Sequence, residues 1–256
     1  MERQIPTQRE RQARIREALI RQGEVSSADL ARDFSVSIET VRRDLSALER
    51  KGQALRTHGG ATSRGGDSLA HIDARIGVDP AAKQRIGKLA GQLLEAGMSV
   101  FIGGGSTALA AAWEMRGGVR ASFVTNMVDV ATTLSVGGQD DITLLGGRFF
   151  AHTHTVLGVE AMEMIDRRSF DLAFLGASAF DTERGLLSPT ENQLQVSHVV
   201  RRRARKVAIL ATSSAFTRHH CFTALPLREI DMIITNSSPS ARDYATLDAA
   251  EVEIHY

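Results

Sequence analysis

The chain of 256 residues is poor in cysteine, proline and aromatic residues, and it has no long apolar run. Its single cysteine, Cys221, excludes an intrachain disulfide and a cysteine-based zinc site. No apolar stretch approaches the roughly 18 residues that cross a bilayer, and the first residues lack the pattern of a cleavable leader. We therefore expect a cytoplasmic, folded protein without a membrane partner.

Neither sign of charge is in excess, because the formal net charge is only +1. The charge is unevenly distributed, however. Residues 1–62 carry twelve Lys and Arg against nine Asp and Glu, whereas the rest of the chain is weakly acidic. This bias favours the N-terminal quarter as a nucleic-acid contact, but it is too small for a protein that binds DNA without sequence preference.

The N-terminal quarter has the pattern of three short helices followed by a hairpin. Residues 9–22, 26–34 and 38–51 each have apolar side chains at helical spacing, and the second and third of these segments follow serines that can cap a helix. Residues 53–61 contain the Gly59–Gly60 pair, which predicts a short β-hairpin, or wing. This order is typical of a winged helix-turn-helix domain.

In such a domain the third helix must project from the body to enter the major groove. The outer face of that helix and the wing carry side chains that can bond base edges or phosphate oxygens. We therefore expect these DNA-binding residues: Ser37, Glu39, Thr40, Arg42, Arg43, Arg56 and His58. A three-helix docking module with a solvated arginine face is the alternative that the physical pattern leaves open.

From residue 80 onward, apolar strands and amphipathic helices alternate, which predicts an α/β domain with a mostly parallel, Rossmann-like sheet covered on both faces. The expected strands are 99–102, 122–124, 142–145, 170–175, 207–211 and 232–235, with an edge strand at 252–256, and the expected helices include 81–95, 127–135 and 191–203. The segment 63–79 has no clear period and is interpreted as a linker between domains 1–62 and 80–256.

Glycine-rich or small-residue loops follow four of these strands, at residues 103–107, 125–126, 146–148 and 176–178. The carboxyl ends of parallel strands meet at one edge, and a glycine-rich loop that opens a helix offers N–H groups to an anion. We expect a phosphorylated small molecule there, although a tight turn is the alternative explanation for each glycine taken alone. The first loop has neither a P-loop nor a GxGxxG pattern, so a nucleotide is not favoured.

Histidines do not predict a metal site in this chain. His152 and His154 lie on one loop without cysteine or carboxylate neighbours in sequence, and His219 and His220 are similarly placed. We interpret all four as surface residues, and we expect neither a metal nor a cofactor.

The stretch SSADLARDFSVSIETVRRDLSALERKGQALRTHGGA, residues 26–61, closely resembles the DNA-binding segment of the DeoR/GlpR family of bacterial transcriptional regulators. Residues 83–236 resemble that family's C-terminal sensor domain, whose fold is related to ribose-5-phosphate isomerase and the CoA transferases. The resemblance implies a repressor of a carbohydrate or related catabolic operon that acts as a homo-oligomer, dimer or tetramer. A phosphorylated sugar-like effector would release it from operator DNA. It implies these effector-binding residues: Lys83, Gly104, Gly105, Ser106, Thr107, Thr125, Asn126, Gly146, Gly147, Arg148 and Glu191.

The chain departs from the usual family pattern at four positions. Gly103 and Thr212 stand where the family commonly has Asp, and Ser197 and Ala215 stand where it commonly has Lys. Strong directional contacts to a ligand are thereby lost. A sugar-phosphate isomerase or CoA-transferase-like enzyme is the second hypothesis, but such catalysis needs a positioned carboxylate and a Lys or Arg. We therefore expect a regulator and no enzyme.

Overall fold

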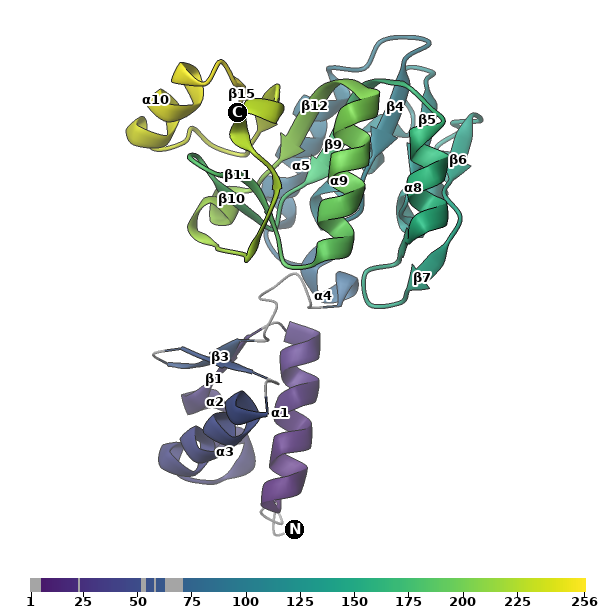
Figure 1. Cartoon of the computed structure of the whole chain (residues 1–256). Coiled ribbons are helices and arrows are strands. Elements are labelled where there is room, and N and C mark those ends of the chain that lie inside the picture. Colours follow the sequence, from purple (N-terminus) through teal and green to yellow (C-terminus); the bar gives the residue numbers. More distant parts are fainter. Residues whose placement is uncertain (1–5, 23, 52–53, 58, 63–70) are drawn as a thin grey trace. The chain divides into compact units, whose positions relative to one another are not determined.

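The computed structural model describes residues 6–22, 24–51, 54–57, 59–62 and 71–256. The chain divides into two compact units, Met1–Arg75 and Ile76–Tyr256, each with a hydrophobic core of its own (Figure 1). Within the described ranges, no helix is both long and apolar enough to span a bilayer.

The N-terminal unit contains the predicted three helices and wing. Helices α1 (Gln8–Gln22), α2 (Ser27–Phe34) and α3 (Ile38–Arg50) pack with an antiparallel sheet in the order β1 (Glu24–Ser26), β3 (Gly60–Thr62), β2 (Leu55–Arg56). Strand β1 was not predicted. The apolar faces of the helices and the wing meet in one core, which includes Ile15, Leu19, Leu30, Phe34, Val41, Leu45 and Leu48. The winged helix-turn-helix prediction is confirmed.

Side-chain caps explain where these helices begin. Ser26 Oγ accepts hydrogen bonds from the N–H groups that open α2, and Ser37 Oγ accepts one from the N–H of Thr40 at the start of α3. At the start of α1, the Glu10 carboxylate accepts from the N–H and the hydroxyl of Thr7, and these bonds lower the pKa of Glu10. The short turn therefore lies between the C-terminus of α2 and the capped N-terminus of α3.

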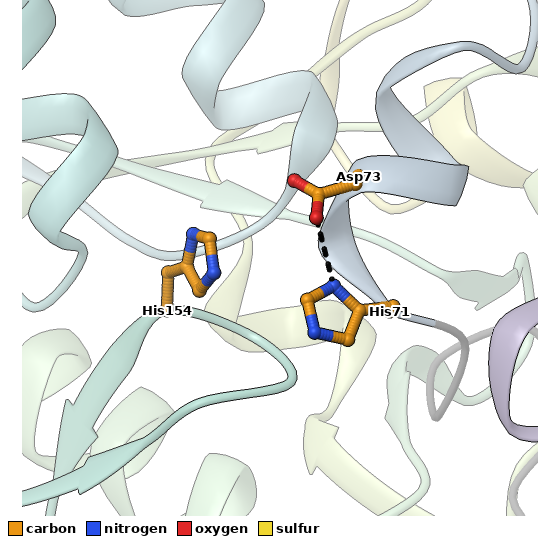
Figure 2. Close-up of side chains that lie close together, drawn as sticks. All are labelled: His71, Asp73 and His154. Atoms are coloured by element: carbon orange, nitrogen blue, oxygen red, sulfur yellow. Dashed lines mark ion pairs between the residues drawn. The ribbon is translucent and has the colours of Figure 1, made fainter.

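A short helix, α4 (Ile72–Ile76), lies within the segment expected to be a linker. Of that segment, residues 63–70 lie outside the described residues. His71 precedes the helix, and its Nδ1 lies 3.1 Å from Asp73 Oδ2. Figure 2 marks this pair with a dashed line. The sequence did not predict α4, because five helical residues are too few to establish a hydrophobic period.

The C-terminal unit is built on a seven-stranded sheet in the order β15-β14-β12-β9-β4-β5-β6, in which every neighbouring pair is parallel. The strands are β4 (Ser99–Ile102), β5 (Ser122–Thr125), β6 (Ile142–Leu144), β9 (Phe170–Gly176), β12 (Ala204–Leu210), β14 (Met232–Ile234) and β15 (Glu253–His255). The predicted parallel α/β domain is confirmed, including the edge strand at the C-terminus.

Helices cover both faces of this sheet, so most residues of its central strands are apolar and buried. Helices α5 (Pro80–Gly91), α6 (Ser106–Met115) and α7 (Val128–Val136) pack side by side, and α8 (Val159–Asp166) packs against α9 (Glu191–Arg203). In Figure 1, α8 and α9 lie in front of the sheet and α5 lies behind it. The last helix, α10 (Ala241–Ala249), precedes β15.

Two small antiparallel sheets complete the unit, and the sequence predicted neither. Strands β7 (Arg148–Phe150) and β8 (Thr155–Leu157) form a hairpin. Strands β10 (Ala179–Asp181), β11 (Gly185–Ser188) and β13 (Phe222–Leu225) form a sheet, next to the 3-10 helices η2 (Ser213–Thr217) and η3 (Leu227–Glu229).

Candidate functional site

The first half of α3 presents a polar outer face. Arg42 and Arg43 are exposed there, and each lies near Glu39, with N–O distances of 3.9 and 3.8 Å. Ion pairs this exposed contribute little free energy, so both guanidinium groups are available to a partner. Thr40 lies between them and the start of the helix, with its Oγ1 2.8 Å from Ser37 Oγ.

The wing supplies one more of the predicted residues. Arg56, on β2, is exposed, and its backbone N–H donates to Glu49 Oε1 at 3.1 Å, which ties the wing to α3. His58 lies outside the described residues. The structure therefore places four predicted residues on α3, a fifth at its N-cap, and a sixth on the strand that contacts this helix.

A buried ion pair fixes the orientation of α3, and sequence reasoning missed it. Arg11 Nε lies 2.7 Å from Asp44 Oδ2, and the side chain of Asp44 is 1% exposed. Gln12 Nε2 donates to the other carboxylate oxygen at 3.3 Å, and a second nitrogen of Arg11 donates to Pro6 O at 2.8 Å. The one sequence signal for this pair is that the carboxylate Asp44 directly precedes the inward-facing Leu45. This network holds α3 at one rotation about its axis against α1.

In the C-terminal unit the order of the strands defines a switch point. From β4 the chain proceeds through β5 to β6 on one side, and from β9 it proceeds through β12, β14 and β15 on the other. In open parallel sheets, ligands bind beyond the carboxyl ends of the two strands where this order reverses. The loops after β4 and β9 therefore define the candidate effector site.

The loop after β4 leads into the N-terminus of α6, where backbone N–H groups can bind an anion. Gly105 has a φ of 124° at the start of α6, and among the described residues no side chain caps the first turn. A Cβ on Gly104 would lie 2.4 Å from Thr155 Cγ2, so a side chain here would displace that of the buried Thr155. Gly105 N–H points to Met127 Sδ at 3.3 Å. The N–H groups at Ser106 and Thr107 face the end of the helix where an anion is favoured.

Asn126 lies beside this loop and contributes an unused polar atom. The residue is 4% exposed, and its Oδ1 has no hydrogen-bond partner among the described residues. A Cβ on Gly104 would lie 3.8 Å from the same oxygen. A buried polar atom without a partner costs free energy, which a bound molecule would recover. Its neighbour Thr125 has a structural part, because its Oγ1 accepts the N–H of Met127 at 3.1 Å.

The other predicted effector residues lie at the same edge but have different surroundings. Lys83, in the first turn of α5, is buried and donates from Nζ to Val78 O. Glu191 is the exposed first residue of α9. Both helices begin at the carboxyl edge, because each returns antiparallel to the strand that follows it.

Gly146 and Gly147 have structural explanations. Gly146 N–H donates to Met164 Sδ at 3.1 Å, and Gly147 has a φ of 128° with Leu157 O 2.9 Å from where a Cβ would lie. Arg148 is exposed, with its guanidinium carbon 5.2 Å from the centroid of the Phe150 ring.

Two histidines interpreted as plain surface residues have specific partners. His154, labelled in Figure 2, belongs to the C-terminal unit, and its Nδ1 lies 2.8 Å from Asp129 Oδ2. Asp129 is 25 positions away in sequence, so no neighbouring residue indicates this pair. His220 Nε2 lies 3.0 Å from Ser178 Oγ, at the end of β9. Neither contact has a local signal in the sequence.

Comparison with known proteins assigns both units. The DeoR C terminal sensor domain matches residues 79–237, and the DeoR-like helix-turn-helix domain matches residues 11–65. The chain belongs to the DeoR family. It is therefore a DNA-binding transcriptional regulator and not an enzyme, and the hypothesis of isomerase or transferase activity is set aside.

Relatives of this DeoR-family chain match it over nearly its whole length. The HTH-type transcriptional regulator GlpR of Haloferax volcanii is 30% identical over 96% of each chain. The glycerol-3-phosphate regulon repressor of Escherichia coli K12 is 28% identical, covering 91% of this chain and 92% of its own. The putative aga operon transcriptional repressor of Escherichia coli O157:H7 is 28% identical, covering 99% and 95%.

Among solved structures, one match shares the fold of this DeoR-family regulator at low identity, and another match is weaker. The tetrameric eIF2B-beta2-delta2 complex from C. thermophilum matches with a TM-score of 0.50 and 13% identity, covering 97% of this chain and 90% of that one. Ribose 5-phosphate isomerase A from Methanocaldococcus jannaschii matches with a TM-score of 0.40 and 17% identity over 54% of each chain. At such identities the first of these likenesses concerns the fold alone.

Proposed function

We propose that this DeoR-family regulator is a repressor of a carbohydrate or related catabolic operon. It binds operator DNA as a homo-oligomer, through α3 and the wing, and leaves the DNA when a small phosphorylated metabolite binds at the carboxyl ends of β4 and β9. The observation that carries the effector part is the uncapped start of α6 beside the buried, unpartnered Asn126 Oδ1. The names of two relatives, repressors of the glycerol-3-phosphate regulon and of the aga operon, support the class of genes.

A symmetric homo-oligomer, dimer or tetramer, fits this role because operators are usually read as repeated half-sites. Coupling between the two units requires the effector to favour one arrangement of the DNA-binding units over another by roughly 1–3 kcal/mol. Such a difference changes operator affinity by about 5- to 150-fold.

The experiment that tests the function is operator binding by the purified chain. Fragments from upstream of its own gene and neighbouring genes are titrated with and without a panel of sugar monophosphates and sugar acids. Specific binding that one compound abolishes supports an inducible repressor. Equal binding to operator and random DNA at fixed salt would contradict it.

Arg42 is the side chain on α3 that we expect to read a base. Arg42→Ala should weaken operator binding by about 1–3 kcal/mol and relax the preference at one base pair, because a bidentate contact to guanine is lost. Binding is measured against operators substituted at each position. Arg50→Ala, at the far end of the same helix, is the matched control. A loss that is equal on every sequence would instead make Arg42 a phosphate contact.

Ser106 opens α6 at the candidate anion site. Ser106→Ala should leave operator affinity unchanged and raise the effector concentration that releases half of the DNA by about tenfold, because a hydroxyl at the anion is lost. The exposed Ser135, at the end of α7, supplies the control variant Ser135→Ala. If Ser106→Ala weakens operator binding itself, the loop has a structural part in DNA binding.

A further inference from the structure

The contact between Ser178 and His220 lies at the switch point of the sheet. Ser178 follows β9, the middle strand, and its Oγ is 3.0 Å from His220 Nε2. Gly176, two residues earlier, lies against the α6 loop, since a Cβ on it would be 3.2 Å from Gly104 O. Two residues span at most about 7 Å. Ser178 is therefore within the length of a small molecule from the start of α6.

The loop that carries His220 is fixed at both ends. Before it, η2 is anchored by the buried Ala215 and by Phe216, whose ring centroid lies 5.4 Å from that of Phe180. After it, β13 pairs with β11. Both residues of the contact are half-buried. The imidazole is thus held toward the end of β9, and the side chains do not need to become ordered when a ligand arrives.

The loop segments that directly follow four of the strands are polar and uncharged, although the charged Lys83 and Glu191 lie along the same edge and Arg218 lies two positions before His220. The segments after β4, β9, β12 and β14, residues 103–107, 177–178, 211–217 and 235–240, contain no Asp, Glu, Lys or Arg. Hydroxyls and amides lie there instead: Thr212 Oγ1 is 3.0 Å from Ser214 Oγ, and Asn236 Oδ1 accepts the N–H of Ser213 at 2.8 Å. The helix start is the one feature of these segments that favours an anion.

We propose that the Ser178–His220 pair determines specificity by binding a hydroxyl group of the effector, whose anionic group lies at the N-terminus of α6. This inference rests on the proposed function and adds the residues that recognise the effector beyond its anionic group. At the pair itself the ligand group is a neutral hydroxyl, because the loop segments there offer it hydroxyls, amides and one imidazole.

The chemistry of the pair suits a hydroxyl. When the imidazole is neutral, one proton lies between Ser178 Oγ and His220 Nε2. If Oγ donates that proton, its lone pairs accept a ligand hydroxyl, and if Nε2 donates it, the serine hydroxyl is left to donate outward. In both tautomers the pair offers a neutral hydrogen-bonding group. A ligand without the hydroxyl does not use this group. Sites of this kind discriminate strongly against such analogues.

The test uses the full chain on its operator, with pentose and hexose monophosphates, their monodeoxy analogues and inorganic phosphate as probes. Ser178→Ala and His220→Gln each remove one end of the contact, so either variant suffices if the other fails to fold. His219→Gln, at the exposed neighbouring position, is the matched control. The readouts are the compound concentration that releases half of the operator and the affinity for inorganic phosphate, measured by calorimetry.

Both variants should need about tenfold more of the active monophosphate, should respond to one deoxy analogue as the wild type does, and should bind inorganic phosphate normally. The double variant should be little worse than either single one, because the two residues act as a pair. Unchanged release by both variants overturns the inference while leaving the proposed function intact. A wild-type chain that no compound releases from its operator overturns the proposed function and this inference with it.

Discussion

Replacing Asp44 with alanine should lower the free energy of unfolding of the N-terminal unit by about 3–5 kcal/mol, because it leaves the Arg11 guanidinium buried without its counter-ion. The carboxylate is 1% exposed and accepts hydrogen bonds from both Arg11 and Gln12, so removing it leaves both donors without this partner. Because this network also sets the rotation of α3, operator binding should fall in parallel. Native-state hydrogen exchange of the α3 amides measures the loss within this unit alone.

The exposed pair between Arg32 and Asp29 supplies the control. Its N–O distance of 2.8 Å is as short, yet both side chains are more than half exposed, so Arg32→Ala should cost less than about 1 kcal/mol. The double variant Arg11→Met with Asp44→Leu should recover most of the stability that Asp44→Ala loses, since apolar residues of similar volume often replace a buried ion pair without loss. A cost below about 1 kcal/mol for Asp44→Ala would contradict the importance of its burial.

Gly60→Ala should destabilise the same unit by about 3 kcal/mol and misplace the wing. A Cβ at this position would lie 1.8 Å from the carbonyl oxygen of Val25, in the strand β1 with which β3 pairs. The oxygen belongs to the backbone, so it cannot move aside as a flexible side chain does. The two strands must separate, and operator binding should weaken because Arg56 is carried on the displaced hairpin.

The adjacent Gly59 is a natural control for this substitution. A Cβ on Gly59 would meet nothing within 4 Å, so Gly59→Ala should change the free energy of unfolding by less than about 1 kcal/mol, and it could even increase it by restricting the unfolded chain. Chemical denaturation of the two variants side by side separates the steric effect from the general effect of losing a glycine. Equal destabilisation by both would show that the close approach of β1 and β3 is not the cause.

Elements with a long or capped pattern were predictable from the sequence. Helix α9 spans Glu191–Arg203 as expected, and α3 begins at Ile38 after the cap Ser37. The central parallel strands were found because both of their faces are buried, which gives short apolar runs. Strands of three or four residues in the small sheets were missed, since so few residues establish no alternation.

The candidate sites were predictable only in part, for a related reason. Glycine-rich loops and outward-facing arginines are local patterns, so the α6 loop and the face of α3 could be predicted. The Ser178–His220 contact joins residues 42 positions apart, and the Arg11–Asp44 contact joins residues 33 apart. Such pairs depend on how the elements pack, and no local spacing in the sequence indicates them.

The placement of the candidate effector site beyond the ends of β4 and β9 also bears on how this regulator can evolve. The parallel pairing ends at Ile102 and Gly176, and the loops that would face a ligand begin directly after these residues. Substitutions in those loops do not change the register of the sheet or its buried apolar runs. A lineage with this scaffold can therefore acquire a response to a new metabolite by a few substitutions at loop positions other than the closely packed Gly104, without a large loss of folding stability.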